Sequence, residues 1–153
     1  MALNPEPRIE LGQEMLLIGL RQKHAFSALP MEIPKQWAAF KQQYMANQFS
    51  PITYGVICSV DQREMEYMCG IEVSSFDSAP SEMGRIKIPK QKYAVFTHTG
   101  HISEIGNSWE SIMDAHAPAL NLEDAHTPSF ERYDGRYDPL TGNGVLEIWY
   151  PIK

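Results

Sequence analysis

Several features that mark common protein classes are scarce or missing in this 153-residue chain. No apolar stretch approaches the roughly 18 residues of a membrane span. The start, MALNPEPRIE, lacks the basic and apolar regions of a signal peptide. We therefore expect a cytoplasmic protein without membrane contact. The 13 Lys and Arg residues are scattered singly among 19 Asp and Glu residues, so direct nucleic-acid binding, which needs basic patches, is not expected.

Signatures of cofactor, metal and nucleophile chemistry are also missing. The chain has no Gly-x-Ser-x-Gly elbow, no Walker loop and no Gly-x-Gly-x-x-Gly motif. Its two cysteines, Cys58 and Cys69, lack metal-type spacing and are predicted to be reduced thiols. His98 and His101 have a spacing that can serve a metal, but no third ligand accompanies them, which favours ordinary histidines at a strand end. No cofactor and no metal are expected.

A repeated order of predicted elements is the main positive signal. RIELGQEMLLIGL, from Arg8, and RIKIPKQKYAVFT, from Arg85, have the same strand-like layout 77 residues apart. A helical pattern and then a probable hairpin follow each of them, so a βαββ unit is predicted twice, at about 8–75 and about 84–152. We predict one α+β domain, 1–153, with pseudo-twofold symmetry. Its two helices pack on antiparallel sheet, with a ligand pocket between the repeats.

Each predicted helix has an apolar stripe that includes a tryptophan. In the first helix Pro34 is suited to the first helical position, and the stripe consists of Trp37, Phe40, Tyr44 and Met45. The stripe of the second helix consists of Ile102, Ile105, Trp109, Ile112, Met113 and His116. Both stripes are predicted to face sheet, and Met113 is expected to be part of the core.

The last predicted hairpin contains two acidic residues in otherwise apolar strands. Glu131 and Tyr133 share a strand face in SFERYDGRY, as Glu147 and Trp149 do in GVLEIWYPI. If the hairpin register makes these two faces coincide, two carboxylates and two aromatic rings line one surface, which suits a flat lipophilic cation. The alternative is that Glu131 is a solvated edge residue and that Glu147 is satisfied by a backbone NH or by Tyr133.

Four segments taken together resemble the GyrI-like family, the effector-binding domain of AraC-type and MerR-type transcription regulators. They are IPKQKYAVFTHTG, SWESIM, PSFERY and LEIWYPI. The resemblance implies a duplicated βαββ fold whose pocket accepts lipophilic, often cationic compounds. By motif match it implies ligand-binding roles for Glu131 and Glu147, with Tyr133, Trp149 and Trp109 as walls. No DNA-binding helices precede the domain, so a stand-alone member is expected.

Three functions remain open at this stage. The first is a small-molecule binding module whose acidic residues select lipophilic cations. The second is a hydrolase of reactive small electrophiles, in which a pocket Glu is the general base and a Tyr hydroxyl assists the leaving atom. The third is a gyrase-inhibitor-like module that binds a protein partner, for which the scattered charge offers no obvious surface. Binding is the interpretation that the residues favour.

Overall fold

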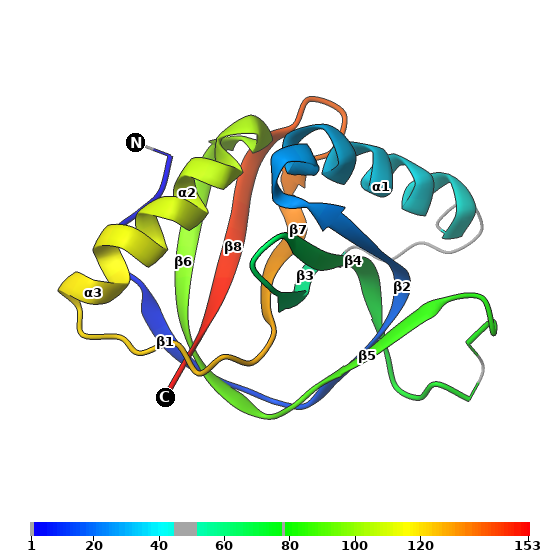
Figure 1. Cartoon of the computed structure of the whole chain (residues 1–153), viewed down its shortest axis with the longest axis horizontal. Helices are drawn as coiled ribbons and strands as arrows, with labels where there is room; N and C mark the ends of the chain where they lie inside the picture. The colour runs from blue at the N-terminus through cyan, green and yellow to red at the C-terminus, as the bar shows by residue number, and fades with distance from the viewer. Residues whose placement is uncertain (1, 45–51, 78) are drawn as a thin grey trace. The chain divides into compact units, whose positions relative to one another are not determined.

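The computed structural model describes residues 2–44, 52–77 and 79–153. The chain forms two compact units (Figure 1). Unit 1 consists of Met1–Gln13 together with Lys90–Lys153, and unit 2 consists of Glu14–Pro89. Within each unit the strands pair antiparallel and one helical region is present, which confirms the predicted α+β class.

The described residues of unit 2 form four strands in the order β5-β2-β4-β3. They are β2 (Met15–Ala25), β3 (Thr53–Val60), β4 (Glu64–Val73) and β5 (Gly84–Ile88). The hydrophobic cluster of this unit includes Phe40, which is fully buried, and packs against Trp37. The predicted apolar stripe of the first helix therefore contributes to the core through these two rings.

Helix α1 spans Leu29–Tyr44 and follows a short 3-10 turn at Phe26–Ala28, named η1. The predicted start at Pro34 is wrong, because Pro34 lies inside the helix. Pro30 occupies the first turn instead, where a missing backbone NH removes no helical hydrogen bond. Met45, the last residue of the predicted stripe, lies outside the described residues.

Unit 1, over the residues that the structure describes, has four strands in the order β1-β6-β8-β7. They are β1 (Arg8–Gly12), β6 (Gln91–His101), β7 (Ser129–Asp138) and β8 (Asn143–Ile152). The core side chains on the helix-facing side of this sheet include Phe96, Leu146 and Ile148, all of them fully buried. Alternation along β8 therefore places Leu146 and Ile148 on one face and Glu147 on the other, as the sequence predicts.

The second helical region changes its winding along its length. A 3-10 turn, η2 (Ile102–Glu104), leads into α2 (Ile105–Ser111), then into a π segment, η3 (Ile112–His116), and into α3 (Ala117–Ala119). Ile112 is fully buried, whereas Met113 is 54% exposed, so its predicted core position is wrong. A π segment has more residues per turn than an α-helix, which moves Met113 out of the apolar stripe.

The two predicted first strands are each divided into two strands that belong to different units. β1 pairs with β6, and β5 pairs with β2. In the chain, β1 is followed directly by β2, but β1 belongs to unit 1 and β2 to unit 2. In the same way β5 is followed directly by β6, but β5 belongs to unit 2 and β6 to unit 1. Each unit therefore obtains its edge strand from outside its own βαββ segment.

Candidate functional site

Glu131 on strand β7 lies at the centre of a cluster of aromatic side chains in unit 1. Its side chain is buried, with 5% of the residue exposed. The indole Nε1 of Trp109, on α2, donates a hydrogen bond to Oε2 of Glu131 at 2.8 Å. The Tyr133 hydroxyl donates to Oε1 at 2.8 Å. The structure therefore brings three of the five predicted site residues together.

Tyr137 is a fourth member of this cluster, which the sequence analysis missed. Its ring meets that of Tyr133 edge to face, with 5.0 Å between the ring centroids. Burial, followed by the negative charges of Glu131 and Asp138, raises the pKa of Tyr137. Alternation along β7 from Glu131 through Tyr133 leads to Tyr137, so a signal was present in the sequence. We call Glu131, Trp109, Tyr133 and Tyr137 the Glu131 cluster.

The expectation that the faces of Glu131 and Glu147 coincide is wrong. In the β7–β8 pairing, Glu131 lies opposite Ile148, whereas Glu147 lies opposite Arg132. Directly opposed residues in an antiparallel pair project to the same face, so the two carboxylates point to opposite faces of the sheet. A register shifted by one residue would have placed them on the same face, and the hairpin adopts the other register.

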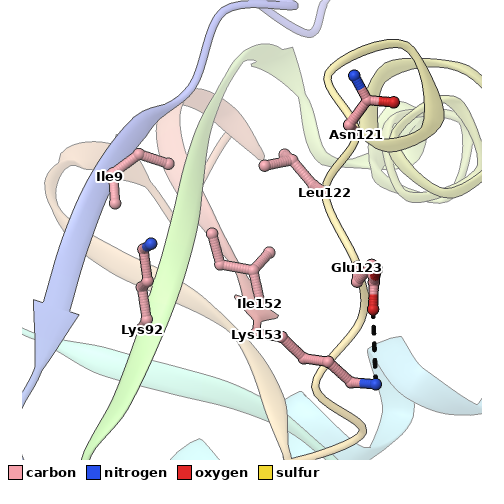
Figure 2. A pocket seen from close by; sticks show the side chains of 7 residues that line it. All are labelled: Ile9, Lys92, Asn121, Leu122, Glu123, Ile152 and Lys153. Atoms are coloured by element: carbon pink, nitrogen blue, oxygen red, sulfur yellow. Dashed lines mark ion pairs between the residues drawn. The ribbon is translucent and has the colours of Figure 1, made fainter.

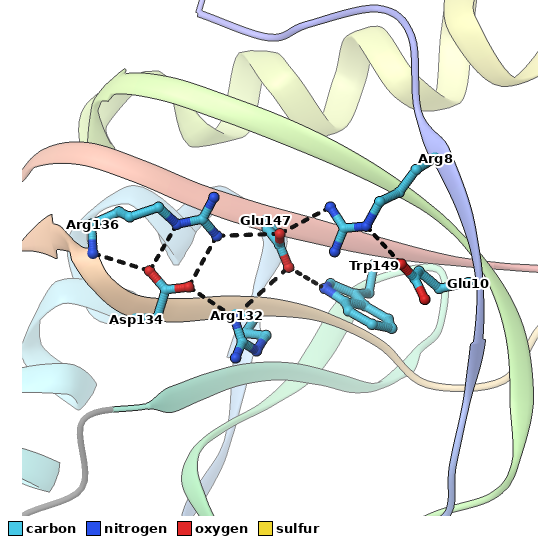
Figure 3. A network of polar contacts seen from close by, with 7 residues as sticks. All are labelled: Arg8, Glu10, Arg132, Asp134, Arg136, Glu147 and Trp149. Atoms are coloured by element: carbon cyan, nitrogen blue, oxygen red, sulfur yellow. Dashed lines mark hydrogen bonds and ion pairs between the residues drawn. The ribbon is translucent and has the colours of Figure 1, made fainter.

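Glu147 is held by arginines that come from two strands (Figure 3). Nη1 of Arg8, on β1, lies 3.0 Å from Oε2 of Glu147, and Nη2 of Arg136, on β7, donates to the same oxygen at 3.2 Å. Trp149 Nε1 donates to Oε1 at 3.0 Å. Arg132 lies more distant, with Nη1 at 3.9 Å from Oε1. The charge of Glu147 is therefore compensated inside the chain, and Tyr133 is not its partner.

These contacts set the ionisation of Glu147. Burial raises the pKa of the Glu147 carboxyl, but hydrogen bonds from Arg8, Trp149 and Arg136 and the positive charge of Arg8 lower it more. The net result is a pKa below the ordinary value. Glu147 is therefore ionised at neutral pH although only 4% of the residue is exposed.

Asp134 joins the two arginines of β7 into the same network. Its Oδ2 accepts from Arg132 Nη1 at 2.8 Å and from Arg136 Nη2 at 2.9 Å. The hydrogen bond from the Arg136 side chain is the main cause that lowers the pKa of Asp134 to about 2. We call Arg8, Glu10, Arg132, Asp134, Arg136 and Glu147 the arginine network; it carries three positive and three negative side chains.

Trp149 packs against other side chains on the same face as Glu147. Its ring is stacked on Phe130, with 5.3 Å between centroids and an angle of 18° between the rings. Tyr93 meets it edge to face at 5.3 Å, and the guanidinium carbon of Arg8 lies 5.8 Å from its centre. This aromatic group and the arginine network cover one face of the sheet of unit 1, opposite the Glu131 cluster.

His98, one of the two histidines considered as metal ligands, is fully buried. Its Nδ1 lies 2.7 Å from the Ser108 hydroxyl, and its Nε2 lies 3.2 Å from the backbone oxygen of His101. Desolvation lowers the pKa of His98. Within the described residues, no group of three or more His, Cys, Asp or Glu side chains is arranged to hold a metal ion.

Comparison with known proteins connects this geometry to a family. The model of the GyrI-like small molecule binding domain matches residues 5–153 and so covers both units. The chain belongs to this family. The resemblance to this family that the four sequence segments indicate is thereby confirmed.

Relatives within and around the GyrI-like family include a transcription regulator and solved structures. The chain is 31% identical over 144 residues to the transcriptional regulator BrlR of Pseudomonas aeruginosa, across 86% of this chain and 53% of BrlR. It thus spans about half the length of that curated relative. SAV2435 bound to tetraphenylphosphonium has a similar fold, with a TM-score of 0.76 and 19% identity over 97% of this chain and 94% of that one.

A DNA complex of the regulator EcmrR contains the same fold as part of a longer chain. The TM-score is 0.64 with 14% identity, over 100% of this chain and 58% of EcmrR. At such identities the likeness concerns the fold alone. The chain is thus a GyrI-like small-molecule-binding domain with a relative among transcription regulators. Across the described residues, helices are too short or too polar to span a membrane.

Proposed function

We propose that this chain binds lipophilic cations of drug-like size, and that the Glu131 carboxylate receives their positive charge. Trp109 and Tyr133 supply aromatic surface beside that carboxylate. One observation carries the proposal: a buried carboxylate lies among aromatic side chains of α2 and β7. A carboxylate attracts a cation more strongly in a low-dielectric site than in water, and aromatic faces attract cations as well.

The hydrogen bonds of the Glu131 cluster also support a binding role. The indole NH of Trp109 and the hydroxyl of Tyr133 donate to the two carboxylate oxygens and orient them. In the arginine network, guanidinium groups contact Glu147 on the other face of the sheet. We assign Glu131 to the ligand because it lies among aromatic side chains, and contact of Glu147 or Trp149 with a ligand stays a prediction.

The ligand chemistry has support from a neighbour in fold. SAV2435 was solved with tetraphenylphosphonium, a lipophilic cation. Membership in a small-molecule-binding family agrees with this class of ligand. We propose that residues 1–153 act as one effector-binding domain for such compounds.

The experiment is calorimetric titration with tetraphenylphosphonium and with tetraphenylborate, which has a similar shape and the opposite charge. We expect the cation to bind with a dissociation constant of about 1 μM, which corresponds to about 8 kcal/mol. The borate should bind at least about tenfold more weakly, a difference of about 1.4 kcal/mol. Equal affinity for the two ions would overturn the proposal.

Two matched variants locate the carboxylate. Glu131→Gln should weaken binding of tetraphenylphosphonium about tenfold, because it removes the charge and keeps a hydrogen-bonding side chain. Glu147→Gln is the control, a change of the same kind on the opposite face of the sheet, and should alter the affinity less than about threefold. Unfolding curves of both variants verify that they are folded at the assay temperature. A loss confined to Glu147→Gln would contradict the assignment.

A further inference from the structure

A hollow in unit 1 is lined by residues that all differ from those of the Glu131 cluster and the arginine network. Its volume is about 430 Å³, within the range of small-molecule sites. Seven side chains from β1, β6, the end of β8 and the segment after α3 surround it (Figure 2). They are Ile9, Lys92, Asn121, Leu122, Glu123, Ile152 and Lys153.

Three apolar side chains, Ile9, Leu122 and Ile152, line this hollow together with polar ones, and the exposed side chain of Leu11 lies beside it on the same strand as Ile9. On the edge strand β1, Ile9 lies opposite Ala94 of β6, and Leu11 lies opposite Lys92 of β6. On its other side, Lys92 lies opposite Ile152 of β8. These side chains therefore share one face of the sheet. Ile9 is 52% exposed and Leu11 is 68% exposed. Adjacent exposed apolar side chains of this kind mark interaction sites more often than isolated ones do.

The opposite wall is held in a defined backbone conformation. After α3, Asn121 adopts a left-handed conformation with φ of 56°. The backbone NH of Leu122 donates to the oxygen of Ala117, and that of Asn121 donates to the oxygen of Pro118. This is the Schellman pattern of a helix end, for which asparagine is well suited. The side chain of Leu122 is thereby positioned over the hollow before any ligand arrives.

The same wall is also attached to strand β8. The backbone NH of Lys153 donates to the oxygen of Glu123, and Asp124 forms a bridge with Ile152. The backbone NH of Ala125 donates to the oxygen of Pro151. The segment is therefore fixed at both ends, so binding would cost little ordering of the chain.

Charge at the rim defines the chemistry of the occupant. The Nζ of Lys153 lies 3.5 Å from Oε2 of Glu123, which compensates that lysine. The second lysine, Lys92, forms no ion pair within the described part of the chain. The amide of Asn121 adds a neutral hydrogen-bonding group at the rim. The Lys92 ammonium beside the apolar side chains of Ile9, Leu122 and Ile152 suits a ligand with an apolar body and one negative group.

We propose that this hollow binds small amphipathic anions, carboxylates with an aliphatic or aryl body, and that Lys92 contacts the carboxylate while Ile9, Leu122 and Ile152 contact the body. The ligand class is opposite in charge to that proposed for Glu131, and the two sites have no residue in common. A binding experiment can therefore test each site without the other.

The experiment is a titration of the isotope-labelled full chain, followed by amide chemical shifts, with three ligands of equal chain length. They are octanoate, octanol and octylammonium. Octanoate should shift the amides of residues 9, 92, 122 and 153 in a saturable manner, with a dissociation constant below about 1 mM. Octylammonium should bind at least about fivefold more weakly, because Lys92 repels it. Equal affinity of the three ligands, or no saturation by octanoate, would overturn the proposal.

Two lysine variants and one carboxylate variant complete the test. Lys92→Gln should weaken octanoate about threefold and leave octanol unchanged, since only the charged contact is lost. Lys90→Gln makes the same charge change at an exposed residue outside the hollow and should leave octanoate binding unchanged. Glu131→Gln should also leave it unchanged, which separates this site from the one proposed for cations. Equal effects of the two lysine variants would refute the role of Lys92.

Discussion

The two units have the same strand order but differ in the side chains that their sheets carry, as one row of paired residues across each sheet shows. In unit 2 this row has glycines on three neighbouring strands, which are Gly84 on β5, Gly19 on β2 and Gly70 on β4. Tyr54 completes the row on the fourth strand, β3. In unit 1 the row that likewise starts at the first residue of the edge strand consists of Arg8, Val95, Trp149 and Phe130. At the same place in the sheet, one unit has a close approach of backbones and the other has Arg8 beside the ring of Trp149, which is stacked on Phe130.

The helices of the two units show a parallel difference. In unit 2, Trp37 Nε1 donates to the hydroxyl of Tyr67 at 3.2 Å. In unit 1, Trp109 Nε1 donates to the carboxylate of Glu131 at 2.8 Å. Each helix therefore contacts its sheet through an indole NH, and the acceptor is a hydroxyl on β4 in unit 2 and a carboxylate on β7 in unit 1. The comparison teaches that, among the described residues, unit 1 has buried carboxyl side chains on both faces of its sheet.

The largest effect is expected where unit 2 has no room for a side chain. A Cβ atom at Gly19 would lie 1.8 Å from the backbone oxygen of Cys69, so β2 and β4 would have to separate. Gly19→Ala should lower the free energy of unfolding by at least about 3 kcal/mol, measured by urea denaturation. In unit 1, Thr97→Ala at a half-buried position of strand β6 should cost less than about 1 kcal/mol, because it adds no atom to the sheet. Equal losses would remove the distinction between the two sheets.

The next effect concerns the buried carboxylate of unit 1. Glu147→Gln should lower the free energy of unfolding by about 2 kcal/mol at pH 7, because Arg8 and Arg136 lose their shared partner. We place the value below that of fully buried pairs because the side chains of Arg8 and Arg136 are 45% and 47% exposed. A change below about 0.5 kcal/mol would mean that water replaces the carboxylate.

The contribution of Glu147 should also depend on pH. Because the pKa of Glu147 is lowered on folding, its stabilisation is complete above the ordinary pKa of 4.5 and is lost as the pH falls through the lowered native value. The difference in stability between the wild type and Glu147→Gln should therefore shrink below pH 4.5. Denaturation curves at several pH values measure it. A difference that stays constant down to pH 3 would contradict the lowered pKa.

A smaller effect on the free energy of unfolding is expected from substitution of the two helix tryptophans, Trp37 and Trp109. Trp109→Phe and Trp37→Phe remove similar volumes, but the first also removes a donor to a carboxylate. Hydrogen bonds to charged groups contribute about 1 kcal/mol more than neutral ones, so Trp109→Phe should be the more destabilising by about that amount. In a Glu131→Gln background the excess should disappear. Its persistence there would assign it to packing.

The smallest effect is expected at the exposed end of the arginine network. The Arg8 and Glu10 side chains are 45% and 42% exposed, and their atoms Nε and Oε1 lie 2.8 Å apart. Glu10→Gln should change the free energy of unfolding by no more than about 0.5 kcal/mol, because water screens such a pair. Thermal unfolding at low and high salt provides the measurement. A larger loss would show that Glu10 orients Arg8 toward Glu147.

The sequence predicted those features that depend on local periodicity. The two tryptophan-bearing helices, the two hairpins and the repeated element order are confirmed, because alternation and helical spacing are read from neighbouring residues. Glu131, Tyr133 and Trp109 also come together, which the motif match implied. Local patterns thus sufficed for the α+β class and for most of one cluster.

The features that failed depend on relations between strands. A shift of one residue in the pairing of β7 with β8 decides whether Glu131 and Glu147 share a face of the sheet. The alternation of apolar and polar residues along either strand does not determine this register, nor the irregular pairing of β7 between Tyr133 and Tyr137. The arginine partners of Glu147 were missed because Arg8 lies far away in the chain. Arg132 and Arg136 are on the strand face opposite Glu131, which was a signal that went unused.

The exchange of edge strands has a consequence for synthesis of the chain. Strand β1 is complete at Gly12, but its partner β6 begins only at Gln91. During synthesis on the ribosome, β1 therefore cannot pair with β6 until all of unit 2 has been made, and Arg8 cannot form its ion pair with Glu147 until β8 has been made. Such distant pairings slow folding. Unit 2 has all of its strands by Ile88, so it is the part of the chain that is able to fold first.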